Sequence, residues 1–241
     1  MFEYTLGDAL VIPLTYLFFC VAAIAWRFAF KNAKPFLKML PLKIFAAVVF
    51  IAEIAKQIYY NCFEEFTLYI LPLHFCSLFI VLLPLSQLCG ERFAKIFKPA
   101  TFVYSFFVVV LIIANPHALL GDSPSHPFAS FHNTHTLIYH MSVAGYFIFS
   151  VILEDYEPKP AHCINVLCGI AIYTAYAVPC AYLLNTNYVN ILYSQFAPLE
   201  SFRLACGQVA YNVVLFCLAS AAGCAVCLIA CLLNKIKSRR A

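Results

Sequence analysis

The stretch ALVIPLTYLFFCVAAIAWRFAF, residues 9–30, contains a single charged residue, Arg27. About 20 predominantly apolar residues are needed for an α-helix to cross the hydrocarbon core of a bilayer. Residues 9–30 meet that length with almost no charge. The stretch therefore predicts a membrane-spanning helix, and the rest of the chain follows the same pattern.

The composition extends this prediction to the whole chain. Of its 241 residues, 64% are hydrophobic and only 11% are charged, whereas soluble domains carry roughly 25% charged residues. A soluble core could not hide so much apolar surface, so the surrounding solvent must be lipid. We expect an all-α, polytopic membrane bundle that forms a single transmembrane domain over residues 1–241.

Apolar runs of at least about 18 residues predict seven transmembrane helices. They lie near residues 9–30, 44–62, 68–89, 100–119, 134–153, 165–184 and 204–233. Of the 15 Lys and Arg residues, all but Lys56 and Arg203 flank the first, third and fifth connections or the C-terminal tail. Because basic loops remain in the cytoplasm, we expect the N-terminus outside and the C-terminus inside.

The twelve cysteines do not predict a disulfide framework or a metal site. Most lie inside apolar runs, where cysteine behaves as a small hydrophobic residue. No CxxC pair occurs in a polar loop beside histidines, which is the usual spacing of a zinc site. We therefore expect no metal ligands and no cofactor.

Polar side chains gather in the predicted outer half of the membrane. Cys76 and His140 each follow about six residues after the outer end of a predicted helix, roughly 9 Å deep at 1.5 Å per residue. Other polar residues fall in the same layer or near it: Glu53, Lys56, His74, Asn115, His117, Thr136, Asn187 and Tyr188. Such groups are costly in lipid unless they share an interior, so their convergence favours a functional site.

Each of these residues also has a purely structural interpretation. Glu53 and Lys56, at i,i+3 spacing, could be an ion pair on one helix face. Cys76 alone could be a packing residue, and His140 alone an interhelical hydrogen-bond donor. In a regular helix His74 and Cys76 would point about 200° apart and could not face one pocket.

Taken together, Cys76 and His140 suggest nucleophilic catalysis. A thiol becomes a strong nucleophile when a nearby imidazole takes its proton. At the predicted depth the pair would reach the ester carbonyl of a phospholipid. Thr136, four residues before His140 on the same helix face, could orient the ring.

Three sequence blocks carry a resemblance to a known family. The stretch Leu71-Pro72-Leu73-His74-Phe75-Cys76 resembles the LPLHxC signature of the YwaF-like bacterial integral membrane proteins, relatives of transmembrane protein 164. The segment from Ser130 to His140 is similar to the next block of that family, and Asn187-Tyr188 is similar to its late NY element. The resemblance implies a seven-helix fold in a bacterial plasma membrane.

For the eukaryotic relatives, the resemblance also implies acyl transfer between glycerolipids through a cysteine thioester. Carried over, Cys76 would be the nucleophile, His140 the general base and acid, and His74 a supporting residue. Asn115, His117, Asn187 and Tyr188 are candidate donors to the developing oxyanion. We expect a lipid acyltransferase or acyl hydrolase whose partners are membrane lipids and not nucleic acid. The oligomeric state is not indicated.

Two alternatives remain open at this stage. A transporter or binding protein for a small solute or ion could use Glu53, Lys56, His74 and His140 along its path. The absence of an internal repeat weighs against a transporter. A haem or metal protein could use His74, His117, His135 or His140.

Overall fold

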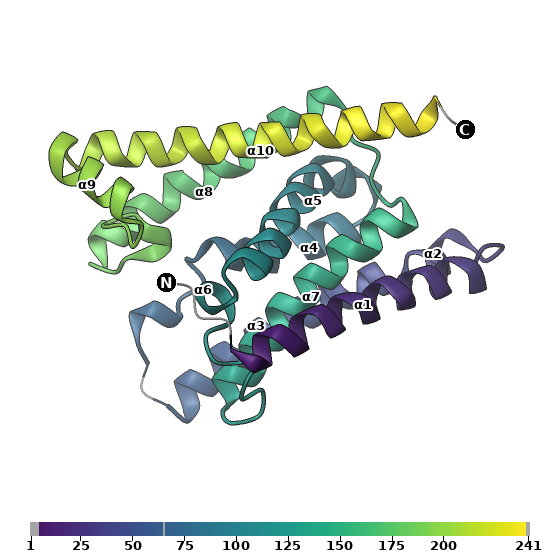
Figure 1. Ribbon diagram of the computed structural model, residues 1–241, viewed down its shortest axis with the longest axis horizontal. Coiled ribbons are helices and arrows are strands. Elements are labelled where there is room, and N and C mark those ends of the chain that lie inside the picture. The colour runs from purple at the N-terminus through teal and green to yellow at the C-terminus, as the bar shows by residue number, and fades with distance from the viewer. Residues whose placement is uncertain (1–4, 65, 240–241) are drawn as a thin grey trace. The chain divides into compact units, whose positions relative to one another are not determined.

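The computed structural model describes residues 5–64 and 66–239, and every regular element within them is helical (Figure 1). The all-α prediction is therefore confirmed. The chain divides into two compact units, each formed from two segments. Unit 1 comprises residues 1–59 and 79–157, and unit 2 comprises residues 60–78 and 158–241.

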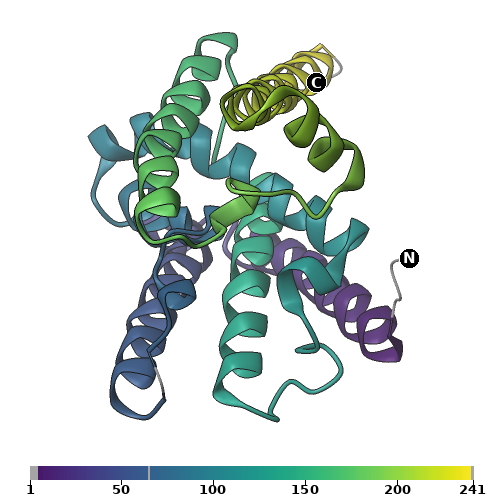
Figure 2. The same ribbon diagram turned by 90° about the vertical axis from the view of Figure 1, so that its left-hand side faces the viewer.

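Unit 1 is organised around α7. Its helices are α1 (Leu6–Ala29), α2 (Pro35–Lys38), α3 (Leu40–Cys62, which continues beyond the unit), α4 (Phe79–Gln87), α5 (Glu91–Ala114), α6 (Pro116–Leu120) and α7 (Phe131–Leu153). α7 packs against α1 and α5, and α5 also packs against α4. An irregular loop over residues 121–130 joins α6 to α7 (Figure 2).

Side chains satisfy the first N–H groups of α1 and α7 in unit 1. The Thr5 hydroxyl accepts from the Asp8 N–H at 3.1 Å, and the Asp8 carboxylate accepts from the Thr5 N–H at 2.9 Å. This reciprocal capping box fixes the start of α1. At α7, the Ser130 hydroxyl accepts from the Asn133 N–H at 3.1 Å.

A charged contact joins three helices of unit 1. Lys98 on α5 forms a 2.6 Å ion pair with Asp155, which follows α7 and is only 3% exposed. The Gln87 side chain, at the end of α4, donates to the Asp155 carboxylate at 2.9 Å and to the Tyr146 hydroxyl at 3.1 Å. A buried carboxylate is tolerated when it is paired and hydrogen-bonded in this way.

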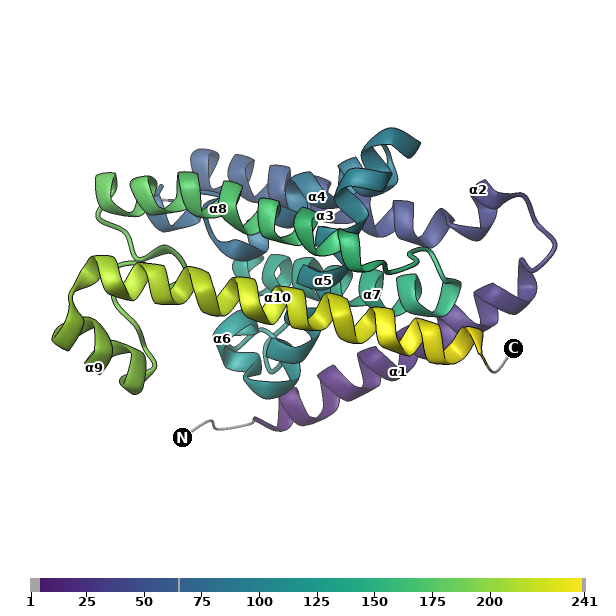
Figure 3. The ribbon, with the colours of Figure 1, turned by 90° about the horizontal axis from the view of Figure 1, so that it is seen from above.

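Unit 2 is a helical hairpin with an irregular outer segment. Its elements are the 3₁₀ turns η1 (Leu68–Ile70), η2 (Phe75–Leu78), η3 (Pro160–His162) and η4 (Tyr188–Asn190), with helices α8 (Cys163–Leu183), α9 (Ala197–Cys206) and α10 (Gln208–Ser238). α8 packs along α10. The chain reverses between α9 and α10 at Gly207, whose φ of 87° suits glycine (Figure 3). A Cβ on Gly223 of α10 would lie 2.8 Å from Val166, so glycine permits close helix packing there.

Five helical segments are long and apolar enough to cross a membrane within the part of the chain that the structure describes. They are Leu6–Ala29, Glu91–Ala114, Phe131–Leu153, Pro160–Leu183 and Gln208–Ser238. The chain is thus an integral membrane protein with several apolar helices. α3 has the length of a span but carries Lys43, Glu53 and Lys56, and it is not among the five.

The predicted continuous helix over residues 68–89 is corrected by the structure. This region contains η1, a turn, η2 and the nine-residue α4. Pro72 explains the interruption, because proline lacks an N–H and disfavours helical backbone at the preceding residue. Leu71 accordingly has φ −55° and ψ 144°. Two other predicted boundaries shift at Pro116, which ends α5 at Ala114, and at Gly207, which delays α10 to Gln208.

Removal of the Asp155 carboxylate is expected to destabilise unit 1. In Asp155→Ala, Lys98 would keep its charge in a largely buried position without its partner, a loss of about 2–4 kcal/mol. We expect the midpoint of thermal unfolding, followed by circular dichroism in detergent, to fall by roughly 5 °C or more. Glu157→Ala, at an exposed neighbouring position, is the control. An unchanged midpoint for Asp155→Ala would contradict the assigned role.

Candidate functional site

The segment from η1 to η2 is held in place by two tyrosines of unit 2. The Tyr173 hydroxyl on α8 donates to the Leu73 carbonyl at 2.9 Å. The Tyr188 hydroxyl donates to the Leu68 carbonyl, and its side chain is fully buried. Carbonyls outside regular helices still need donors in apolar surroundings. These two bonds therefore fix the backbone of η1 and of the turn that precedes His74.

His74 lies between two aromatic rings of the same unit. Its ring meets those of Tyr69 and Tyr188 edge to face, at centroid distances of 4.3 and 5.3 Å. Its Nε2 lies 3.2 Å from the Tyr69 carbonyl. A carbonyl oxygen can only accept, so Nε2 carries the proton and Nδ1 is the basic nitrogen of the neutral ring.

Cys76 lies in η2 and is half-buried. Its thiol is within electrostatic range of the hydroxyl groups of Tyr69 and Tyr173. Tyr69 therefore contacts His74 and lies within electrostatic range of Cys76. The expectation that His74 and Cys76 must face opposite directions assumed a regular helix, and Pro72 removes that assumption.

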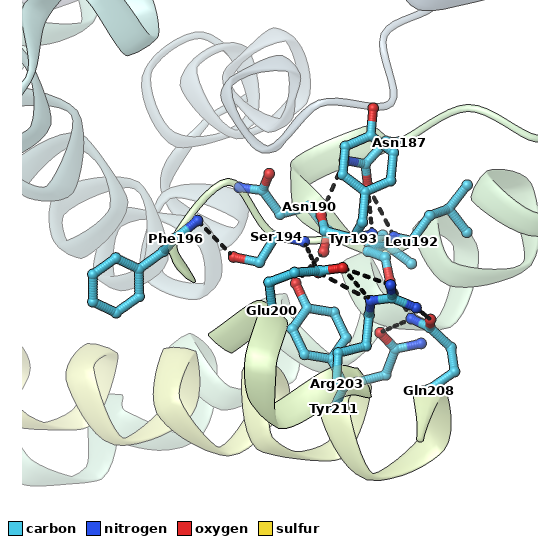
Figure 4. Close-up of polar contacts among 12 residues, drawn as sticks. Asn187, Asn190, Leu192, Tyr193, Ser194, Phe196, Glu200, Arg203, Gln208 and Tyr211 are labelled. Carbon is cyan, nitrogen blue, oxygen red and sulfur yellow. Dashed lines mark hydrogen bonds and ion pairs between the residues drawn. The ribbon is translucent and has the colours of Figure 1, made fainter. Parts of the chain in front are cut away.

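Asn187 organises the loop that presents Tyr188. Its side-chain oxygen accepts from the N–H groups of Leu192 and Tyr193 at 2.9 and 3.3 Å, and its amide donates to the Tyr193 carbonyl at 3.0 Å (Figure 4). Positive φ angles at Val189 and Asn190 bend the backbone tightly here. In this structure the NY element thus supports the 68–76 segment through Asn187 and Tyr188. Its predicted oxyanion contacts remain a prediction.

A second network anchors the same loop to α9 and α10. Arg203 forms an ion pair with Glu200 at 2.5 Å and donates to the Gln208 side chain at 3.2 Å (Figure 4). Glu200 also accepts from the Ser194 N–H at 2.8 Å. The hydrogen bonds from Arg203, together with that N–H, lower the pKa of the Glu200 carboxyl to about 2.

In unit 1, Glu53 and Lys56 form the centre of a polar cluster between α3 and α7. Glu53 is 4% exposed and pairs with Lys56 at 2.6 Å. Gln57 donates to the same carboxylate at 2.8 Å, and His135 Nε2 lies 3.9 Å from its other oxygen. That His135 nitrogen is buried and makes no hydrogen bond in the structure. The ion pair predicted on one helix face is thus present, and α7 adds a histidine beside it.

His140 and Thr136 lie one turn apart on α7. The His140 Nδ1 is 2.9 Å from the Thr136 carbonyl. Nδ1 must therefore donate, which leaves Nε2 as the basic nitrogen of the neutral ring. Thr136 contacts the ring through its backbone carbonyl.

Asn115 and His117 belong to the end of α5 and to α6. The Asn115 side chain accepts from the Ala118 N–H at 3.3 Å and caps α6. His117 faces Asp122 at 3.7 Å, with both side chains largely exposed. Both residues have local structural partners, and their predicted oxyanion roles remain predictions.

Among residues 5–64 and 66–239, no three or more His, Cys, Asp or Glu side chains are grouped so as to hold a metal ion. Three of the histidines named for a haem or metal alternative have local partners: His74 lies beside Tyr69, His117 beside Asp122, and His135 beside Glu53.

The sequence interpretation overlooked Tyr69, Tyr173, Gln57 and His135 as parts of these clusters. Gln57 lies four residues after Glu53, at a spacing that puts both on one helix face, so its role could have been predicted. Tyr173 could not, because its partner carbonyl at Leu73 lies 100 positions earlier. His135 joins Glu53 only through the packing of α7 on α3.

The apolar helices and their buried polar clusters define an all-helical integral membrane protein. A family model described as the TMEM164 family matches residues 4–231, so the chain belongs to the TMEM164 family. No curated protein and no solved structure matches it significantly.

Asn187→Ala is expected to loosen the support of the 68–76 segment. The change removes three hydrogen bonds that fold the loop around Tyr188, each with a net value of about 1 kcal/mol. Hydrogen–deuterium exchange followed by mass spectrometry should show faster exchange in peptides covering 187–194 and 68–76. Asn32→Ala, at an exposed position outside both segments, is the matched control. Faster exchange confined to 187–194 would refute the coupling between the two segments.

The Glu200 network is expected to resist acid. Because the folded pKa is lowered to about 2, the contribution of this pair is complete above the ordinary pKa of about 4.3. It disappears only as the pH falls through about 2. Hydrogen exchange of a peptide covering Ser194, corrected for intrinsic rates, should therefore stay protected from pH 6 to pH 3. Glu200→Gln should exchange faster at pH 6, and loss of wild-type protection near pH 4 would contradict the lowered pKa.

Proposed function

We propose that this protein is a membrane-embedded acyltransferase or acyl hydrolase of glycerolipids, with Cys76 as nucleophile and His140 as general base and acid. The observation that carries the proposal is the placement of Cys76 in the short 3₁₀ helix η2, directly after a turn that Tyr173 and Tyr188 brace. A buried hydrogen-bonded brace of this kind holds a reactive group in a defined direction, as nucleophilic catalysis requires. Membership of the TMEM164 family adds to the argument.

In the first step, His140 Nε2 takes the proton of the Cys76 thiol. The thiolate attacks the carbonyl carbon of an acyl ester, a carbon–sulfur bond forms, and the ester carbon–oxygen bond breaks. The imidazolium returns its proton to the departing alkoxide oxygen. The hydrogen bond from Nδ1 to the Thr136 carbonyl supports this role, because it leaves Nε2 as the basic nitrogen.

In the second step, a lipid hydroxyl or water resolves the thioester. Its proton passes to His140 Nε2 as its oxygen attacks the acyl carbon, and the carbon–sulfur bond breaks. The released thiolate recovers the proton from the imidazolium. A lipid hydroxyl gives transfer and water gives hydrolysis, so one set of residues serves both reactions.

We further propose seven crossings, with the N-terminus outside and the C-terminus in the cytoplasm of a bacterium. The distribution of Lys and Arg over the connections supports this orientation. α3 would cross with Glu53 and Lys56 neutralising each other, and the 68–87 region would cross through its turns and α4. Irregular backbone is tolerated at membrane depth where protein groups satisfy it, as the tyrosine hydroxyls do here.

The thioester is tested by intact-protein mass spectrometry. Purified wild type, Cys76→Ala and a Cys180→Ala control are incubated with phospholipid at neutral pH. A hydroxylamine-labile fatty-acyl adduct is expected on wild type and Cys180→Ala and not on Cys76→Ala. His140→Ala is expected to lower the rate of adduct formation by a factor of 10²–10⁴, the usual contribution of a general base. An adduct that persists in Cys76→Ala would exclude this cysteine as the nucleophile.

The polar cluster around Glu53 supports one second candidate, an ion-coupled transporter or solute-binding protein. Buried ionisable groups in membrane helices often mark ion or proton pathways, and His135 places a titratable ring 3.9 Å from the Glu53 carboxylate. This alternative predicts that Glu53→Gln abolishes solute or proton flux in proteoliposomes while Cys76→Ala leaves it unchanged. Normal lipid turnover in Cys76→Ala, without an adduct on wild type, would favour the transporter.

A further inference from the structure

A groove of about 590 Å³ lies beside the C-terminal end of α1 in unit 1. Its lining combines aromatic and basic side chains. The residues of these two kinds are Trp26, Phe28, Phe30, Arg27, Lys31 and Lys38. None of them takes part in the proposed acyl chemistry.

One wall of the groove consists of aromatic side chains held in place by hydrogen bonds and ring stacking. The Trp26 indole N–H donates to the carbonyls of Leu37 and Lys38 at 3.3 and 3.2 Å, which folds the connection between α1 and α3 back onto α1. The Trp26 ring stacks on Phe30 at a centroid distance of 4.1 Å. These contacts hold the wall and place Lys38 at the groove.

The positive charge at the groove is only partly compensated. Arg27 pairs with Glu154 at 3.2 Å and donates to the Ile152 carbonyl at 2.5 Å. Within the described parts of the chain, neither Lys31 nor Lys38 forms an ion pair with an acidic side chain. No Asp or Glu occurs between Asp8 and Glu53 in the sequence, and Glu154, which follows the lining residue Leu153, is paired with Arg27.

Two uncompensated ammonium groups beside apolar rings match a ligand that carries an anion next to a hydrocarbon chain. We propose that this groove binds an anionic glycerophospholipid, with its phosphate contacting Lys31 and Lys38 and its apolar part against Trp26 and Phe28. Ammonium groups bind phosphate through charge-assisted hydrogen bonds. A zwitterionic head group fits less well, because its own cation would lie among three basic side chains.

The single tryptophan of the chain reports directly on this groove, since Trp26 lines it and no other tryptophan occurs. Full-length protein in detergent is titrated with phosphatidylglycerol or phosphatidylcholine whose acyl chains are brominated, and quenching of Trp26 fluorescence is measured. We expect saturable quenching by phosphatidylglycerol at a concentration about tenfold lower than that of phosphatidylcholine. Equal quenching by the two lipids would overturn the proposal.

Two double variants distinguish lipid binding in this groove from nonspecific attraction of the lipid to positive surface charge. Lys31→Gln with Lys38→Gln should raise the half-saturating concentration of phosphatidylglycerol about tenfold or more, given roughly 1 kcal/mol for each basic residue near a lipid surface. Lys34→Gln with Lys95→Gln removes the same charge from exposed positions outside the groove. This control should change the half-saturating concentration of phosphatidylglycerol less than twofold. Equal effects of the two double variants would overturn the proposal.

Three further measurements complete the test. Lys31→Arg with Lys38→Arg should retain binding, and the emission maximum of Trp26 without lipid should be the same in all variants, which excludes misfolding as the cause. Inorganic phosphate at millimolar concentration should leave the quenching by phosphatidylglycerol unchanged. Displacement of the lipid by inorganic phosphate would identify a free-phosphate site and overturn the assignment to a lipid.

Discussion

In apolar surroundings every backbone carbonyl that leaves a helix must find a donor within the protein, and this requirement governs the part of the chain that carries Cys76. Pro72 prevents a continuous helix, so the carbonyls around it lose their helical partners. Tyr173 and Tyr188 supply hydroxyl donors to Leu73 and Leu68. The Tyr173 hydroxyl gives the Leu73 carbonyl a donor, and the Tyr188 hydroxyl is a second donor to the Leu68 carbonyl, which also accepts from the Leu71 N–H at 3.3 Å.

The need for a donor to the Leu68 carbonyl also bears on the loop after α8, which carries Tyr188 and contains several side-chain hydrogen bonds. Directly after Tyr188 the backbone turns sharply at Val189 and Asn190, where φ is positive. Such conformations are costly for residues other than glycine, and the surrounding bonds of Asn187 and the Glu200–Arg203 pair offset that cost. A loop remote in sequence from Cys76 is in this way part of its support.

Unit 1 contains two kinds of charged side chain: buried ones that are paired, and lysines at a groove that have no acidic partner among the described residues. Glu53, Lys98 and Asp155 all lie in largely apolar packing, and each has an opposite charge within 2.6 Å. Lys31 and Lys38 lack such partners and border the groove beside Trp26. The contrast has a physical reason, since buried charges need compensation within the protein, whereas charges at a polar boundary can be compensated by water or by the phosphate of a lipid.

The sequence alone determined the all-helical membrane class, because long apolar runs such as residues 9–30 leave lipid as the only suitable solvent. It also indicated the Glu53–Lys56 pair, because the two residues are neighbours on one helix face. Proline is a helix breaker, so the sequence contains the cause of the interruption at Pro72. The sequence does not indicate that tyrosines from α8 and η4 would hold the interrupted segment. Partners such as Tyr173 and Leu73, or His135 and Glu53, lie far apart in sequence, and only the packing of helices decided that they meet.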